Sequence, residues 1–433
     1  MIINKGKWRL HATRTDKFKV SYLGFRFIMP KNAYRTPLTK LMLSVMMRGS
    51  MHYPTVTDIN RRLDELYDTT VSLGNSSTGD RCVFSISCKI LNNKFLLDGD
   101  TTDVLLETVK LIEDVLCNSL LDGDGLLRAD YVESEKRIAI DSIRSIVNDQ
   151  RAYAIKKCLE NMLSGTRFGI SSSGDEQTVE AFTARELTEN IRYFKENAIV
   201  ECFYIGAEDP LRVAEVIGDR FDSFTVSCAD KKYSEYAFVS HRASVLKASE
   251  AMNVSQTRIA MGYTAGTVLS DKDNFAMALA NDVFGGSSVS KLFMNVREKK
   301  SLCYYCYSAY RNDRGTICVE CGVSPENCDA AIDEISHQLC ELQAGNISDA
   351  EIETSKRAII SGLVQQKDNP MVMSAFTLRR LLAGIEQTAE DCIEIIKSVT
   401  REEIIAAAQK IKLDTIFVLE GNGNDDEEGD DYE

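Results

Sequence analysis

Two similar series of apolar patterns follow one another along the chain. Each series opens with a mostly apolar run typical of a strand, at 21–30 and at 256–265. A stretch with the pattern of a β-hairpin comes next, at 69–91 and at 304–323. In the second stretch, Asn-Asp-Arg-Gly at 312–315 supplies the residues of a turn. Hairpin-joined strands mixed with helical patterns predict an α+β protein whose sheets are largely antiparallel.

An internal repeat relates the two series. Three landmarks occur in the same order in both halves: a charged helix start, a capping box with Thr at the N-cap and Glu three residues later, and a β-rich run. They lie at 132–137, 183–186 and 200–206 in the first half and at 352–357, 400–403 and 415–421 in the second.

The repeat predicts two similar domains of one duplicated fold, each a largely antiparallel sheet with helices packed on it. We expect the domains to span 1–223 and 239–422, joined by a linker at 224–238. The remaining segment, 423–433, is strongly acidic and is expected to be disordered.

Composition narrows the class of protein. The 433 residues are 44% apolar and 27% charged, with a formal net charge of −14, and this balance argues against a nucleic-acid partner. No apolar stretch approaches the ~18 residues that span a bilayer, and the N-terminus has no signal-peptide pattern. Thirteen cysteines in such a chain are typical of reduced thiols, so we expect a cytoplasmic protein without membrane contact.

Two motifs carry a resemblance to a known family. Met47-Arg48-Gly49-Ser50 stands in the first half; the second half has Phe284-Gly285-Gly286-Ser287-Ser288 and then Val296-Arg297-Glu298-Lys299, followed by a strand-like run from Tyr304. With the duplication, they make the chain similar to the pitrilysin/insulinase (inverzincin) metallopeptidases, which include mitochondrial processing peptidase. The resemblance implies two similar halves facing each other around a central cleft.

The chain departs from this family at the zinc site. Active members carry His-x-x-Glu-His, and the resemblance aligns these ligand and base positions with Lys40, Leu43 and Ser44; the third ligand, a glutamate, aligns with Ser142. Lysine, leucine and serine supply neither good zinc ligands nor a general base. None of the four histidines forms a pair with ligand spacing. We therefore predict a non-peptidase homologue with no catalytic residue, metal or cofactor.

Arg297 and Tyr304 are retained, and the resemblance implies that such a pair holds the substrate peptide opposite zinc. Both side chains can donate hydrogen bonds to a peptide carbonyl or an oxyanion. From residue types alone, a salt-bridged arginine and a packed tyrosine are the favoured explanation, and the substrate role rests on the resemblance. The resemblance thus implies a peptide-positioning subunit paired with a zinc-bearing homologue, or a homodimer. The alternative is a stand-alone scaffold protein.

Two further motifs suggest other chemistry. Cys303-x-x-Cys306 and Cys318-x-x-Cys321 have the spacing of a zinc ribbon. Against this, Cys303 to Cys306 has no Gly or Pro for a tight turn and reads as continuous strand, with the two thiols on opposite faces. Ser288-x-x-Lys291 fits a serine-hydrolase signature whose companion elements are absent. The zinc-ribbon module therefore stays a second alternative to the peptidase-like interpretation.

Overall fold

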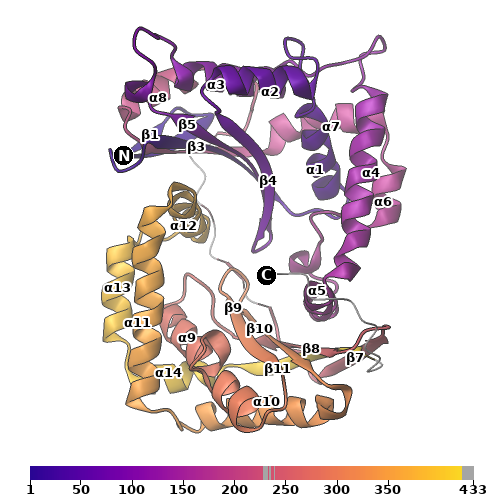
Figure 1. Ribbon diagram of the computed structural model, residues 1–433, viewed down its shortest axis with the longest axis vertical. Coiled ribbons are helices and arrows are strands. Elements are labelled where there is room, and N and C mark those ends of the chain that lie inside the picture. Colours follow the sequence, from indigo (N-terminus) through magenta and orange to yellow (C-terminus); the bar gives the residue numbers. More distant parts are fainter. Residues whose placement is uncertain (228–232, 234–235, 238, 422–433) are drawn as a thin grey trace. The chain divides into compact units, whose positions relative to one another are not determined.

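The computed structural model describes residues 1–227, 233, 236–237 and 239–421. The chain forms two compact units, each with its own sheet and its own apolar core (Figure 1). Unit 1 comprises Met1–Arg144, Ile170–Lys232 and Asn369–Leu378, and unit 2 comprises Ser145–Gly169, Tyr233–Asp368 and Arg379–Glu433.

The sheet of unit 1 has six strands in the order β1-β2-β6-β3-β5-β4. Neighbouring strands are antiparallel except β2 and β6, which run parallel. The strands are β1 (Ile2–Asn4), β2 (Trp8–Arg14), β3 (Val20–Pro30), β4 (Thr70–Thr78), β5 (Arg81–Leu91) and β6 (Ile199–Gly206). The helices are α1 (Arg35–Met46), α2 (Val56–Glu65), α3 (Val104–Cys117), α4 (Ala129–Ser145), α6 (Glu176–Ala181), α7 (Ala184–Asn197) and α8 (Pro210–Ile217).

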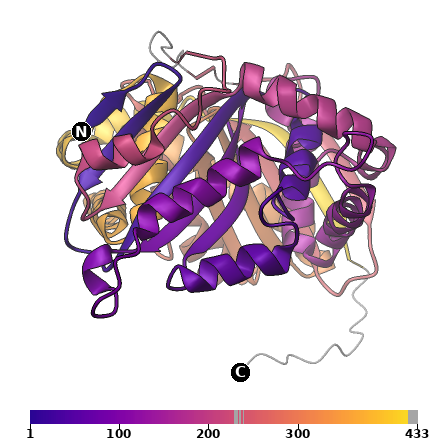
Figure 2. The same cartoon turned by 90° about the horizontal axis from the view of Figure 1, so that it is seen from above.

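The core of unit 1 lies between this sheet and helices that include α1, α3, α7 and α8 (Figure 2). Because side chains alternate along a strand, every second residue of the central strand β3 enters the core. Phe27 is one of them, and its ring lies 5.1 Å from that of Phe194 on α7 and 5.4 Å from that of Phe224. The apolar run at 21–30 thus forms the centre of the sheet.

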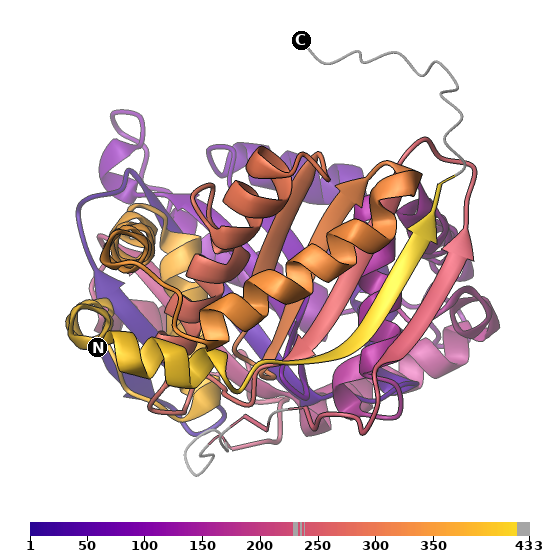
Figure 3. The same cartoon turned by 90° about the horizontal axis from the view of Figure 1, so that it is seen from below.

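The sheet of unit 2 has five strands in the order β7-β11-β8-β10-β9, antiparallel except for the parallel pair β7 and β11 (Figure 3). The strands are β7 (Leu246–Ala251), β8 (Thr257–Thr264), β9 (Tyr305–Arg311), β10 (Thr316–Val323) and β11 (Lys412–Glu420). The helices are α5 (Gln150–Met162), α9 (Asn274–Asn281), α10 (Cys328–Gln343), α11 (Asp349–Gln365), α13 (Ala389–Ser398) and α14 (Arg401–Ala408), and α12 (Pro370–Ala383) has its first turns in unit 1 and its last in unit 2.

Helices cover both faces of the unit 2 sheet. The larger core lies between one face and helices α9, α10 and α14. On the opposite face α5 packs against β8 and β11. Gly262 of β8 permits this close approach, since a Cβ atom there would lie 2.8 Å from Met162 Sδ. A helix that precedes the second half in sequence therefore completes its core.

The duplicated α+β fold predicted from the sequence is confirmed. In order and direction, β2-β6-β3-β5-β4 of unit 1 correspond to β7-β11-β8-β10-β9 of unit 2. Both expected capping boxes are present, one at Thr183 and the other at Thr400. The turn at 312–315 joins β9 to β10, with Gly315 in the left-handed conformation (φ +66°). Three strands were not expected, β1, β2 and β7, because they are short or largely polar on one face.

The compact units differ from two continuous domains by two exchanged segments. Residues 145–169 belong to unit 2, and residues 369–378 belong to unit 1. The boundaries expected at 1–223 and 239–422 stay a prediction. Part of the expected linker and the whole tail at 423–433 lie outside the described residues. No helix in the described part of the chain has the length and apolar content needed to cross a bilayer.

Replacing Phe27 with alanine tests the core of unit 1. We expect Phe27→Ala to lower the free energy of unfolding by about 3–5 kcal/mol, because the ring is fully buried among three other phenylalanines. Urea denaturation followed by circular dichroism measures this loss. Phe95 is 44% exposed, and Phe95→Ala is the control, with an expected change within about 0.5 kcal/mol. Equal losses in the two variants would contradict this description of the core.

Candidate functional site

Helix α1 carries the three positions that align with the zinc-binding motif. Leu43 is 1% exposed and packs into the core of unit 1. Lys40 is half-buried, and its Nζ donates a hydrogen bond to Ser173 Oγ at 2.7 Å. Ser44 is half-buried one turn further along the helix. The helix thus offers an ammonium group and a hydroxyl beside a buried aliphatic side chain, which do not fit a zinc ion or supply a base.

The nearby thiol of Cys82 does not repair this deficit. Burial lowers the pKa of Lys40, and the electrostatic interaction with Cys82 partly opposes this shift. Burial also raises the pKa of Cys82 to about 12, against the opposing effect of Lys31 and Lys40. At neutral pH Cys82 is therefore a protonated core thiol, whereas a zinc ligand must be a thiolate.

By the resemblance, helix α4 would supply the third zinc ligand. Glu135, a partly buried carboxylate of this helix, is already paired with Arg48. Ser142 lies on the exposed side of this helix. Two turns earlier, Glu135 Oε1 accepts a hydrogen bond from Arg48 Nη1 at 2.7 Å, with side chains only 14% and 29% exposed. The Arg48 guanidinium also lies 5.4 Å from the ring centroid of Tyr131. A guanidinium therefore neutralises the partly buried carboxylate that α4 retains near the expected ligand position.

The ion pair between Arg48 and Glu135 was not foreseen from the sequence. Each residue stands in a motif that drew attention, Arg48 in Met-Arg-Gly-Ser and Glu135 in the first repeat landmark. The two motifs lie 87 positions apart, so only the fold could bring them together.

Arg297 lies in a π-helical segment of unit 2, Leu292–Lys299. Its guanidinium carbon is 4.7 Å from the ring centroid of Phe293, and its Nε is 3.7 Å from Glu298 Oε1. The side chain is 39% exposed. The ring holds the guanidinium by a cation–π contact and leaves N–H donors in solvent, where they can reach a ligand.

Tyr304 lies just before β9, after a tight turn in which Ser301 adopts φ +50°. Its backbone N–H donates to Gly322 O at 2.9 Å, which extends the ladder between β9 and β10. The side chain is 54% exposed, and the hydroxyl lies 3.3 Å from Ser324 Oγ. The phenol is thus fixed at its backbone and open to solvent at its hydroxyl.

A cluster of three thiols lies beside Arg297 and Tyr304. The thiols of Cys303, Cys306 and Cys321 lie close enough to influence one another's pKa. Cys306 and Cys321 stand opposite each other on β9 and β10, and Cys303 precedes β9. The expectation that Cys303 and Cys306 point to opposite faces of a continuous strand is wrong, because the strand begins only at Tyr305.

The fourth cysteine of the zinc-ribbon motif lies elsewhere. Cys318 lies close to Cys158 of α5, which packs on the opposite face of the sheet, and raises the pKa of that thiol. In the described part of the chain no three His, Cys, Asp or Glu side chains are grouped so that they could hold a metal ion. The four-thiolate arrangement that the spacing suggested is not formed.

The thiol cluster gives Cys303 a distinctive acidity. Hydrogen bonds from Cys306 and Cys321, together with the positive charge of Arg297, hold the pKa of Cys303 well below that of an ordinary thiol. The pKa of Cys306 is correspondingly raised. The sequence pattern indicates only a continuous strand with Cys303 and Cys306 on opposite faces. Their proximity to Arg297 follows from the turn at Ser301.

Comparisons with known proteins agree with this description. Residues 181–359 match the family described as peptidase M16 inactive domain. YmfF of Bacillus subtilis, a probable inactive metalloprotease, is 28% identical over 95% of each chain. YmxG of the same organism, an uncharacterized zinc protease, is 22% identical over 70% of this chain and 71% of its own. The crystal structure of a conserved protein from Enterococcus faecalis V583 aligns with a TM-score of 0.87 at 28% identity, covering 98% of this chain and 99% of the other.

Metal analysis tests whether zinc is held by the α1 positions or by the four cysteines of the zinc-ribbon motif. We expect the reduced protein, dialysed against zinc-free buffer, to retain far less than one zinc per chain by inductively coupled plasma mass spectrometry. The reason is that α1 lacks ligands and Cys318 lies away from the other three thiols. A tightly held zinc in every chain would contradict this expectation.

Alkylation kinetics test the acidity of Cys303. At pH 6 we expect iodoacetamide to modify Cys303 faster than Cys328, as measured by peptide mass spectrometry. Both thiols are half-buried, but the pKa of Cys303 is lowered, whereas burial and then Asp329 raise that of Cys328 to about 11. The thiolate is the nucleophile, so the lower pKa gives the faster reaction.

Arg297→Ala is the matched variant for this measurement. Removing the guanidinium should slow the alkylation of Cys303 and leave that of Cys328 unchanged. Equal rates for the two cysteines in the unmodified sequence would contradict the proposed thiolate.

Proposed function

We propose that this chain, a zinc-less and non-catalytic homologue of the M16 peptidases, is the peptide-positioning subunit of a heterodimer whose other subunit carries the zinc site. One contrast carries the proposal. The α1 positions of the zinc motif are occupied by Lys40, Leu43 and Ser44, whereas Arg297 and Tyr304 keep solvent-accessible donors.

The chemistry of the retained pair suits a bound peptide. A guanidinium offers several N–H donors in a fixed plane, and a phenol offers one O–H, so both recognise carbonyl oxygens. Such donors stabilise a developing oxyanion most strongly when they are held in place before the reaction. Phe293 holds Arg297, and the backbone bond to Gly322 holds Tyr304. This pre-organisation supports a role in holding substrate for another subunit.

The relatives support the existence of a suitable partner. In Bacillus subtilis a probable inactive metalloprotease occurs together with a protein named as a zinc protease, and both are similar to this chain. One organism can therefore encode both an inactive homologue and a homologue named as a zinc protease. A homodimer is the competing assembly, and a scaffold without peptide contact is the competing function. We place the pair in the cytoplasm, as the cysteine content suggests.

Co-expression with the zinc-bearing homologue from the same organism tests the proposal. We expect the two chains to elute together in size-exclusion chromatography and to cleave a fluorogenic peptide. In this complex Arg297→Ala and Tyr304→Phe should each lower kcat/KM at least about tenfold, because each removes a donor to the reacting carbonyl. The complex should remain intact in both variants.

Arg357→Ala is the control, since Arg357 is an exposed arginine on α11 of the same unit. Its kcat/KM should equal that of the unmodified complex. Unchanged turnover in the Arg297 and Tyr304 variants would favour the scaffold. Separate elution of the two chains would overturn the heterodimer.

A further inference from the structure

The two sheets differ at one edge. In unit 1, β1 pairs antiparallel with β2, placing Ile3 opposite Leu10, and α8 packs over β2 and α3. Trp8 of β2 donates its indole N–H to Gly218 O at the end of α8, at 3.1 Å. Unit 1 thus closes this edge with an extra strand and a helix.

The corresponding edge of unit 2, strand β7, has neither element. Within residues 239–421 no strand pairs with the outer side of β7. The counterpart of β6 is β11, and no helix follows it in the described residues. Backbone N–H and C=O groups along the outer side of β7 therefore have no ladder partner there. An edge strand in this condition can accept an extended segment from another chain.

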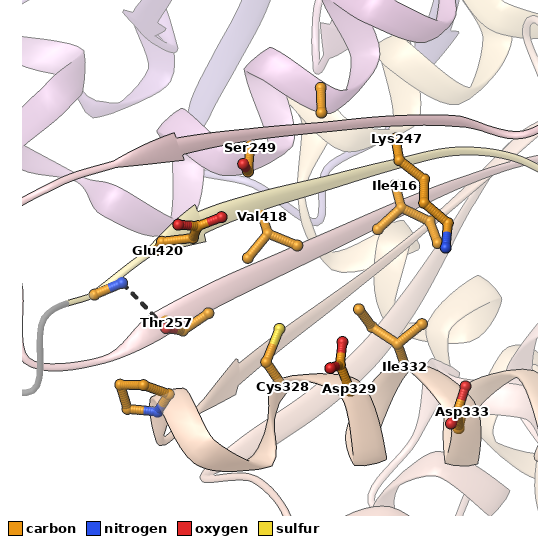
Figure 4. A pocket seen from close by; sticks show the side chains of 13 residues that line it. Lys247, Ser249, Thr257, Cys328, Asp329, Ile332, Asp333, Ile416, Val418 and Glu420 are labelled. Carbon is orange, nitrogen blue, oxygen red and sulfur yellow. Dashed lines mark hydrogen bonds between the residues drawn. The ribbon is translucent and has the colours of Figure 1, made fainter.

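A groove of about 740 Å³ lies beside β7, between the sheet and the N-terminal turns of α10 (Figure 4). Its floor is apolar, with Ile416 and Val418 from β11 and Ile332 from α10. In the parallel register Lys247 pairs with Ile416 and Ser249 with Val418, so these β7 residues face the groove too. Since α10 corresponds to α3, the groove occupies the position that α8 fills in unit 1.

Negative charge surrounds this groove. Asp329 and Asp333 project from α10, and Glu420 stands at the end of β11 (Figure 4). All three are exposed, and none has an ion-pair partner in the described part of the chain. Burial raises the pKa of Cys328, which also lines the groove, and the charges of Asp329 and Glu420 raise it further. Lys247 is the single basic residue among the lining residues.

We propose that β7 and this groove, together the β7 groove, bind an extended, basic segment of a partner protein as an added strand. The segment pairs antiparallel with β7, as β1 does with β2. Because side chains alternate along a strand, every second side chain enters the groove. Small apolar side chains cover Ile416 and Val418, and Lys or Arg side chains reach Asp329, Asp333 and Glu420.

Charge argues against two other occupants. Residues 422–433, which follow β11, contain seven Asp and Glu residues and no Lys or Arg, so the groove repels them. A second copy joined β7 to β7 would bring two acidic grooves together. A basic segment of a different protein is the complementary ligand.

Fluorescence anisotropy with the full-length chain tests the proposal. The probe is a fluorescein-labelled peptide of about nine residues that alternates Val and Lys, at about 0.15 M salt to screen non-specific attraction. We expect saturable binding, and slower amide hydrogen exchange in residues 246–251 when the peptide is bound. A peptide that alternates Val and Glu should not bind. The Val-Lys peptide with a central proline should bind at least about tenfold more weakly, because proline cannot donate to the ladder.

Matched charge variants locate the site. Asp329→Asn combined with Asp333→Asn should weaken binding at least about tenfold. Glu353→Gln combined with Glu402→Gln removes the same charge from exposed positions of unit 2 outside the groove, and should change binding less than about twofold. Like Asp329, Glu402 lies in the first turn of its helix. Each double variant therefore removes one carboxylate from a helix N-terminus, and the effects on helix stability should be similar.

The remaining outcomes count against the proposal. Absence of binding would overturn the proposal. Equal weakening in both double variants would show that the peptide binds by non-specific charge attraction. Much tighter binding by a chain truncated after Gly421 would identify the acidic segment as the occupant. A concentration-dependent dimer in sedimentation that the Val-Lys peptide dissociates would identify a second copy instead.

Discussion

The packing of helix α1 against the sheet of unit 1 is the constraint on which the functional interpretation depends. Nine of its twelve residues are buried. Leu43 stands where the resembling peptidases have their general base, and it contributes to the same core as Phe27 and Phe194. A charged side chain there would lose its hydration without a partner, which costs several kcal/mol. Burial of this position keeps the helix in place and excludes the chemistry of the active family members.

The neighbouring polar groups are consistent with this loss. Lys40 bonds to Ser173 and Glu135 bonds to Arg48, so both of these charged groups have a partner inside unit 1. Buried or half-buried polar groups are tolerated when they are paired. The positions that the resemblance aligns with zinc ligands thus take part in ordinary structural interactions within unit 1.

The duplication explains how one chain can carry two different surfaces. Both sheets share the order and direction of five strands, yet unit 1 covers its first edge with β1 and α8, whereas in unit 2 the described residues leave β7 open. The segment around Arg297 and Tyr304 lies at the other end of the unit 2 sheet, near β9. The two edges of one sheet can thus serve separate ligands, because β11, β8 and β10 lie between β7 and β9.

The sequence by itself determined the duplication, the α+β class, the central strands and the residue types at the positions that the resemblance aligns with the zinc site. These features depend on periodicity, capping boxes and residue identity, all of which are local. It missed β1, β2 and β7, because these strands are short or largely polar on one face and show a weak pattern. Three features are visible only in the tertiary structure. Helix α5 belongs to unit 2 and the start of α12 to unit 1. Arg48 pairs with Glu135, and Cys303, Cys306 and Cys321 lie close together. Such contacts join distant residues or depend on a single turn, and local propensity carries no information about either.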